Sequence, residues 1–273
     1  MPNDIEATLK AADAALRRRR KLASFRGPLH VGVDLGTAYT VVMVLDGRMQ
    51  PMAGAYQFAQ VVRDGVVVDF IGAIDLLKQL KSQVEAKLGV ELTAAASAYP
   101  PGVPLAEVQA VRYVLEGAGL ACATLIDEPT AANALLNVQN GAVVDVGGGS
   151  TGIAVIEDGQ VTYTADEPTG GAHFTLVIAG AKGVSFEEAE ALKLDPDAQM
   201  GLFSTIRPVM EKVATIIQRH LTDRNVQHIT LVGGAAAFPR FAEVVTDVTG
   251  IPTIVPSRPL FVTPIGIAMN HES

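Results

Sequence analysis

The sequence predicts an α/β protein made of two similar lobes, chiefly because it contains an internal repeat. An apolar run that ends in an aspartate and a glycine turn occurs around Asp34 and again around Asp145, 111 positions further along the chain. The register also holds between Gly36 and Gly147. With 273 residues, 49% of them hydrophobic, the chain can form two hydrophobic cores. The duplication therefore indicates two halves, each a mixed sheet flanked by helices.

Both copies are expected to begin as a β-meander. In each copy, an apolar strand is followed by a polar or glycine turn, a second strand, an Asp-Gly turn and a third strand. Helical patterns come next, at 71–88 in the first half and at 185–193 and 201–221 in the second. A further helix begins at Leu105 in the first half and at Phe241 in the second. Short strands flank these last helices, at 94–98, 124–126, 228–232 and 253–255.

The charge is unevenly distributed and excludes some partners. Net charge is −8, but the first 26 residues carry seven basic and three acidic side chains, which leaves about −12 on the rest. An acidic body argues against nucleic acid, because affinity for a phosphate backbone depends on basic surface. No apolar run reaches the roughly 18 residues that a membrane helix needs. We therefore expect no nucleic-acid or membrane partner, and a cytoplasmic location.

The cysteine and histidine content excludes two other kinds of site. Cys122 is the single cysteine, so an internal disulfide framework cannot form. The five histidines lack the spacing of metal ligands. Cys122 is therefore interpreted as a small packed side chain.

The second glycine turn, 145–152, fits three known patterns. A dinucleotide-binding loop and a hydrolase nucleophile elbow both require a helix directly after the turn. Here 153–156 is an apolar strand and 157–159 is a turn, which disfavours both. A phosphate-gripping hairpin instead requires strand, turn and strand, and its backbone N–H groups form a nest for an anion. Two such hairpins in register, each preceded by an aspartate, favour this third interpretation.

Five ordered motifs resemble those of the actin and DnaK-type chaperone superfamily, and the resemblance covers nearly all of residues 28–269. They are the two phosphate motifs, the two connecting segments and the adenosine motif, at 34–40, 145–151, 127–132, 263–268 and 231–234 respectively. The resemblance implies a duplicated ribonuclease-H-like (actin-like ATPase) fold with a nucleotide cleft between two lobes. The expected divisions are an N-terminal helix in 1–26, lobe I in 27–137 plus 258–273, and lobe II in 138–257.

The resemblance also implies ligands and residue roles. ATP, ADP and Mg²⁺ are the implied ligands, with Asp34 and Asp145 holding the metal through water and Glu128 reaching its hydration shell. Asp145 or Glu128 would orient the attacking water. The catalytic candidates are therefore Asp34, Glu128 and Asp145. The residues expected to contact the nucleotide are Gly36, Thr37, Ala38, Tyr39, Gly147, Gly148, Gly149, Ser150, Thr151, Gly170, Gly171, Glu187, Glu190, Lys193, Gly233, Gly234 and Ala235.

Some of these positions have alternative interpretations. Glu190 and Lys193 would share one face of a helix, either at the adenosine or as a surface ion pair. Gly170 and Gly171 are either near the phosphates or a simple turn. The sequence also departs from the DnaK pattern at Gly152, where an aspartate is usual, and in the adenosine motif, where a serine and an arginine are replaced by Ala235 and Ala237. These changes argue against tight ATP binding and fast turnover.

The N-terminal segment lies outside the shared motifs. Asn3 and Glu6 could form a capping box for a helix that ends near Arg20. Ile5, Leu9, Ala12 and Leu16 recur along one face of it. That face either docks on the body or binds a partner in a groove.

Smaller members of the superfamily give the most specific resemblance. Residues 63–70 resemble a segment of the bacterial actin MreB, and by size and motif wording the chain is most similar to a chaperone-like family of ethanolamine-utilisation operons. The resemblance implies protein partners among ethanolamine-utilisation enzymes or components of a bacterial microcompartment. The leading hypothesis is an ATP-dependent conformational switch that acts on a protein partner. Whether the protein is also a slow ATPase is left open by the sequence. The alternatives are a self-associating scaffold with weak nucleotide binding and a small-molecule kinase.

Overall fold

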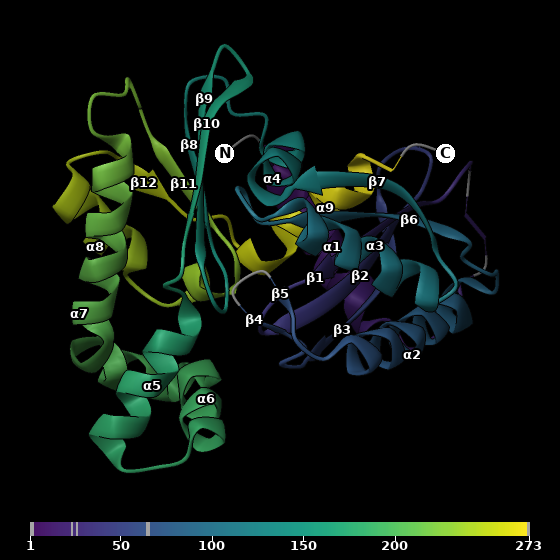
Figure 1. The fold of residues 1–273 in the computed structure, drawn as a ribbon, viewed down its shortest axis with the longest axis horizontal. Coiled ribbons are helices and arrows are strands. Elements are labelled where there is room, and N and C mark those ends of the chain that lie inside the picture. The colour runs from purple at the N-terminus through teal and green to yellow at the C-terminus, as the bar shows by residue number, and fades with distance from the viewer. Residues whose placement is uncertain (1–2, 23, 26, 64–65, 272–273) are drawn as a thin grey trace.

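The computed structural model describes residues 3–22, 24–25, 27–63 and 66–271, and its two lobes lie side by side (Figure 1). Each lobe contains one five-stranded sheet. In both sheets an antiparallel meander is extended by two parallel strands, in the same spatial order. The prediction of a duplicated α/β fold from the sequence repeat is therefore confirmed.

Lobe I is built around the first copy of the repeat. Its sheet has the order β3-β2-β1-β6-β7, with β1 (His30–Leu35), β2 (Tyr39–Leu45), β3 (Pro51–Phe58), β6 (Ala94–Tyr99) and β7 (Ala121–Asp127). Helices α2 (Phe70–Leu88) and α3 (Leu105–Gly117) bury Leu77, Leu80 and Val114 against it. A small hairpin of β4 (Val62–Arg63) and β5 (Val66–Val67) precedes α2. Residues 64 and 65 of the MreB-like segment lie outside the described residues.

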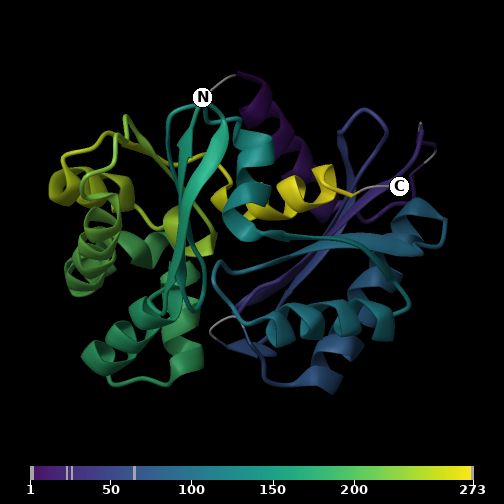
Figure 2. The ribbon, with the colours of Figure 1, turned by 45° about the horizontal axis from the view of Figure 1, so that its top comes forward.

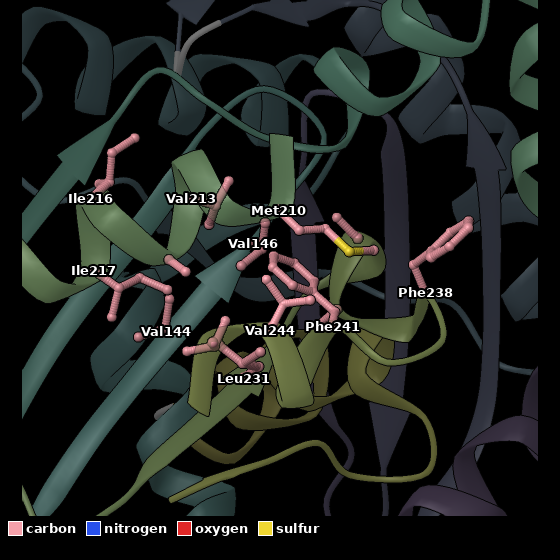
Figure 3. Packing of buried hydrophobic residues seen from close by; sticks show 14 of the residues in the cluster. Val144, Val146, Met210, Val213, Ile216, Ile217, Leu231, Phe238, Phe241 and Val244 are labelled. Atoms are coloured by element: carbon pink, nitrogen blue, oxygen red, sulfur yellow. The ribbon is translucent and has the colours of Figure 1, made fainter. Parts of the chain in front are cut away.

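Lobe II repeats this arrangement in the order β10-β9-β8-β11-β12. Its strands are β8 (Gly141–Val146), β9 (Thr151–Glu157), β10 (Gln160–Glu167), β11 (Ile229–Val232) and β12 (Thr253–Ile254). Its helices are α5 (Gly171–Lys182), α6 (Phe186–Leu194), α7 (Pro196–Leu221) and α8 (Phe241–Thr249). Figure 3 shows Val144 and Leu231 of the sheet packed against Met210 and Val213 of α7 and Phe241 of α8.

Helix α7 begins earlier than the predicted start at residue 201. Asp195 accepts a hydrogen bond from the backbone N–H of Asp197, and Pro196 occupies the first turn. Because proline is tolerated in the first turn and an aspartate is a good N-cap, the helix starts at Pro196. The short strands are also placed as predicted to within a few residues, except that β7 extends over 121–127. No helix among the described residues has the length and apolarity to cross a membrane.

Helix α1 (Asn3–Arg17) docks on the body, and it ends before the predicted Arg20. Ile5, Leu9 and Leu16 on its apolar face are at most 8% exposed, so that face is not available to a partner. The Glu6 side chain accepts a hydrogen bond from the backbone N–H of Ser257, and the side chain of Asn3 lies outside what the structure describes. Figure 2 shows α1 beside the two helices that join the lobes.

These joining helices are α4 (Glu128–Leu136) and α9 (Val262–Met269), and they cross at very short range. A Cβ atom placed on Gly266 would lie 1.8 Å from the carbonyl oxygen of Ala131. Gly32 of β1 is similarly close to α9, where a Cβ would lie 2.5 Å from the backbone nitrogen of Ala268. Glycine at both positions is therefore a packing requirement rather than a turn requirement.

We predict that Gly266→Ala destabilises the protein by at least about 1–3 kcal/mol, since overpacking at a backbone contact forces the two helices apart. The free energy of unfolding from urea titration measures the change. Gly180→Ala in α5 is the matched control, because a Cβ there meets nothing within 4 Å and alanine favours a helix. Equal stabilities for the two variants would contradict the proposed contact.

Candidate nucleotide-binding cleft

The two duplicated turns close in the same way. The N–H of Gly36 donates to the carbonyl oxygen of Tyr39 at 3.1 Å, and the N–H of Gly147 donates to that of Ser150 at 3.0 Å. In the described part of the chain, no hydrogen bond uses the N–H groups of the residues between, 37–38 and 148–149. Each hairpin therefore keeps backbone donors free for an anion.

The two hairpins meet, although they belong to different lobes. A Cβ placed on Gly148 would lie 2.6 Å from the Cβ of Ala38, and one placed on Gly149 would lie 2.9 Å from Oγ1 of Thr37. No larger residue fits at either position without separating the hairpins. The two glycines thus allow the backbones of both lobes to approach one site.

The glycine pair 170–171 begins helix α5 and supports the second hairpin. The N–H of Gly171 donates to the carbonyl oxygen of Gly147 at 2.9 Å, and the N–H of Ala172 donates to that of Gly148 at 2.8 Å. The hydroxyl of Thr151 donates to the carbonyl oxygen of Thr169 just before the pair. These donors hold the hairpin in place and are not turned toward a ligand.

A cavity of about 430 Å³ lies between the lobes, within the range of small-ligand sites. Of the residues expected there, three do not line it: Thr151 and Gly170 are buried beside the hairpin, and Glu187 is exposed on α6. The expected residues that do line it are Asp34, Gly36, Thr37, Ala38, Tyr39, Glu128, Asp145, Gly147, Gly148, Gly149, Ser150, Gly171, Glu190, Lys193, Gly233, Gly234 and Ala235. The structure therefore brings together most of the residues that the sequence assigned to one site.

Three of the carboxyl groups that line the cavity, those of Asp34, Glu128 and Asp145, share a low-dielectric environment. Burial, together with the charge of Asp145, raises the pKa of Asp34 to about 7. Burial also raises the pKa of Asp145 to about 6, although a hydrogen bond from Thr263 opposes the shift. The pKa of Glu128 is raised well above its usual value by burial and by the charges of Asp145 and Asp34. Asp34 and Glu128 keep part of their surface open to the cavity, so they remain accessible to a ligand.

Asp145 connects the lobe II sheet to helix α9. Oγ1 of Thr263 donates to its Oδ2 at 2.6 Å, while its Oδ1 lies 2.2 Å from where a Cβ of Gly233 would stand. Gly233 has φ +87°, a conformation that favours glycine. Both the backbone strain and the space at this position therefore require glycine beside the carboxylate.

The donor set fits a magnesium ion held through water. Carboxylate oxygens are its preferred protein ligands, and the ion usually keeps several waters. Among the described residues, no group of three acidic, cysteine or histidine side chains is close enough to ligate one metal directly. A cation there would also offset the burial that raises the pKa of each carboxyl and the repulsion that adds to the shifts of Asp34 and Glu128.

Glu190 and Lys193 form a buried pair that lines the same cavity. Nζ of Lys193 lies 2.6 Å from Oε2 of Glu190 and donates to Oγ1 of Thr175 at 2.9 Å. Thr175 also donates to Glu190 at 2.5 Å. The interpretation of Glu190 and Lys193 as a solvated surface ion pair is wrong, because their side chains are only 11% and 13% exposed. Their polar atoms are largely satisfied by one another.

Sequence reasoning missed several residues of this region, four of which bear on its chemistry or shape. Tyr56 and Leu260 line the cavity, and Thr263 was recognised only as part of a connecting segment. Asp166 of β10 lies directly opposite Gly152 of β9, and its charge helps to raise the pKa of Glu128 and Asp145. The pairing of β9 with β10 was predicted, but its register was not, and the register decides which side chains are neighbours.

Comparison with known proteins gives the class of this fold. Two family models match, "MreB/Mbl protein" over residues 52–182 and "Type IV pilus assembly protein PilM" over 129–263. The crystal structure of MreB5 of Spiroplasma citri bound to AMPPNP matches with a TM-score of 0.71 and 18% identity, over 88% of this chain and 95% of that one. The fold is that of the actin-like ATPases.

Closer relatives give the particular family. Ethanolamine utilization protein EutJ of Salmonella typhimurium is 42% identical over 255 residues, covering 90% of this chain and 87% of the relative. The crystal structure of EutJ from Carboxydothermus hydrogenoformans matches with a TM-score of 0.92 and 44% identity, over 97% of this chain and 98% of that one. The chain belongs to the EutJ family of ethanolamine utilization proteins, which confirms the resemblance found in the sequence.

The raised pKa values predict how stability depends on pH. Asp34 and Asp145 keep their protons in the folded state over a range where the unfolded chain has already lost them, between about pH 4 and pH 7. Their contribution to stability therefore falls as the pH rises through that window. In metal-free buffer we expect Asp34→Asn to be more stable than the wild type by about 1–2 kcal/mol near pH 8 and nearly equal to it near pH 4.

Urea titrations across this pH range measure the effect. Asp247→Asn in α8 is the control, because that carboxyl is exposed and does not line the cavity. A pH dependence of stability that is the same for Asp34→Asn and the wild type would contradict the buried carboxyl cluster.

Proposed function

We propose that this protein binds ATP with Mg²⁺ between its lobes and acts as a nucleotide-dependent conformational switch on a protein partner. The observation that carries the proposal is the meeting of the two duplicated hairpins above a cavity lined by Asp34, Glu128 and Asp145. Backbone donors from both lobes and a carboxylate cluster are what a nucleotide phosphate with its metal ion requires.

The phosphates would be held by the hairpins. The free N–H groups of 37–38 come from lobe I and those of 148–149 from lobe II. The hydroxyls of Thr37 and Ser150 line the same cavity and add donors. Because the two sets of donors come from different lobes, a terminal phosphate bound by both would join the lobes.

Asp34 and Asp145 would hold the waters of the magnesium ion, and Glu128 would lie at its hydration shell. The ion neutralises the charge that develops on the phosphates during transfer. A carboxylate with a raised pKa is a stronger base toward the proton of an attacking water, which would assign Glu128 or Asp145 to that role. Phosphate release at a slow rate is the corresponding activity.

The switch would act by changing the position of one lobe relative to the other. Thr263 on α9 donates to Asp145 of lobe II, so a metal that occupies Asp145 acts directly on a helix of lobe I. Loss of the terminal phosphate would release one hairpin from the other, as in other nucleotide switches. The partner we propose is an ethanolamine-utilisation enzyme or a microcompartment component in the cytoplasm, and membership of a family of ethanolamine utilization proteins supports the first of these.

We predict that Asp145→Asn reduces affinity for ATP in the presence of Mg²⁺ by at least about tenfold and abolishes phosphate release. Asparagine keeps an oxygen to accept the hydrogen bond from Thr263 but loses the charge that holds the metal. Calorimetric titration with ATP and Mg²⁺, together with a phosphate-release assay, measures both quantities.

Asp247→Asn is the control and should behave as the wild type. If Asp145→Asn bound and hydrolysed ATP as well as the wild type, the assignment of the metal site would be overturned. If Asp145→Asn matched the wild type in binding ATP without Mg²⁺ but bound it more weakly with Mg²⁺, the proposed phosphate site would stand.

A second candidate function is a self-associating scaffold in which nucleotide is weakly bound. It is favoured by Ala235, Ala237 and Leu260, which line the cavity and offer no hydrogen bonds from their side chains. The polar atoms of Glu190 and Lys193 there already satisfy one another. Such a surface gives a nucleotide base little specific recognition.

Light scattering as a function of protein concentration separates the two candidates. The switch predicts that the apparent mass obtained from scattering stays that of a small oligomer as the concentration rises, with or without ATP. A steep rise above a critical concentration would favour the scaffold, because an open head-to-tail assembly grows once nucleation is overcome.

A further inference from the structure

A basic groove lies at the C-terminal end of α1, outside the cleft. It is an open hollow of about 770 Å³ between α1, α2 and β3. Four of its lining side chains are basic, and no acidic side chain lines it. These basic residues are Arg17, Arg18, Arg19 and Lys87.

The charges of this basic groove are poorly compensated. Arg17 pairs with Asp13 at 3.0 Å, but no ion pair among the described residues uses Arg18 or Arg19, and both are exposed. Nζ of Lys87 donates to two neutral carbonyl oxygens, of Leu16 at 2.9 Å and Gly54 at 2.6 Å. An ammonium has three donors, so one remains for a ligand.

Burial lowers the pKa of Lys87, and the positive charge of Arg18 adds to the shift. The two cations therefore repel each other across the groove. Carboxylates bound between them would remove this repulsion and gain charge-assisted hydrogen bonds.

The basic groove also has an apolar component. Leu16, Tyr56 and Ala86 also line it, beside the polar Gln83, and the Tyr56 side chain is 47% exposed. Tyrosine and arginine are among the residues enriched where proteins bind one another. A ligand that carries carboxylates and apolar side chains together matches both parts of the lining.

We propose that the basic groove binds an acidic segment of a partner protein, with its carboxylates on Arg18, Arg19 and Lys87 and an apolar side chain on Tyr56. Residues 27–273 carry a net charge of about −12, and this acidic body would repel the long anionic surface of a nucleic acid or a bilayer. The net charge of −8 disfavours a second copy in the same way.

The position of Tyr56 gives the groove a connection to the cleft. Tyr56 lines both the basic groove and the cavity between the lobes, and its ring centre is 5.9 Å from that of Tyr39 in the first hairpin. A segment in the groove would touch a residue that borders the cleft. The binding itself does not depend on the proposed nucleotide switch, so either can fail alone.

Fluorescence anisotropy with a short labelled peptide of alternating glutamate and leucine tests the proposal. The full chain should bind it saturably at low ionic strength, and binding should weaken as salt is added. The double substitution Arg18→Glu and Arg19→Glu should weaken it by about tenfold or more. Lys182→Glu with Lys212→Glu changes the net charge equally on exposed positions of lobe II and should leave the affinity within about twofold of wild type.

Four results would overturn the proposal: no binding at low salt, equal weakening by both double variants, a groove-dependent preference for duplex DNA or anionic vesicles over the peptide, or sedimentation showing a dimer that only the groove variant loses. Both variants should melt at the wild-type temperature, because the substituted side chains are exposed. A lower melting temperature for the groove variant alone would assign the arginines a structural role and also count against the proposal.

Discussion

The crossing of α4 and α9 is the contact on which the two-lobed arrangement depends. The absence of a side chain at Gly266 lets α9 pass against the backbone of α4 at Ala131, and both helices also carry site residues. Glu128 begins α4, and Thr263 in the first turn of α9 donates to Asp145. Because the same two helices join the lobes and present these groups, a change in the relation of the lobes would alter the site, and under the proposed function a ligand bound there would resist that change.

The carboxyl cluster is costly in the absence of a cation. Removing an ionised carboxylate from water without a partner is strongly unfavourable, and buried acids respond by keeping their protons. Asp34, Glu128 and Asp145 show this response, since burial is the largest cause of the raised pKa of each. A fold that buried acids only for packing would use alanine or valine at these strand and helix ends. The cluster is therefore better explained by a ligand that supplies positive charge.

Local patterns in the sequence predicted more of this structure than long-range pairings did. The strands, the two hairpins and the acids before them follow from alternation and turn chemistry within a few residues, and the repeat then implied two lobes. The spacing of Glu190 and Lys193 predicted that they share a face but not that α6 buries it, and Glu187 on the same helix points to solvent. Asp166 could not be found this way, because its place opposite Gly152 depends on the register of β9 with β10.

Helix α1 shows how an element outside the duplicated fold can act on it. Its apolar face packs in one cluster with residues of both lobes, Met43 and Val143 among them. Its polar side reaches residues 257–258, where the chain returns from lobe II. Oε1 of Glu6 accepts a hydrogen bond from the backbone N–H of Ser257, and Oδ2 of Asp13 lies 3.6 Å from Nε of Arg258. Exposed polar contacts of this kind contribute little energy, so the burial of the apolar face must supply most of the hold on α1. Because α1 packs on residues of both lobes, a change in the relation of the lobes would have to alter that packing.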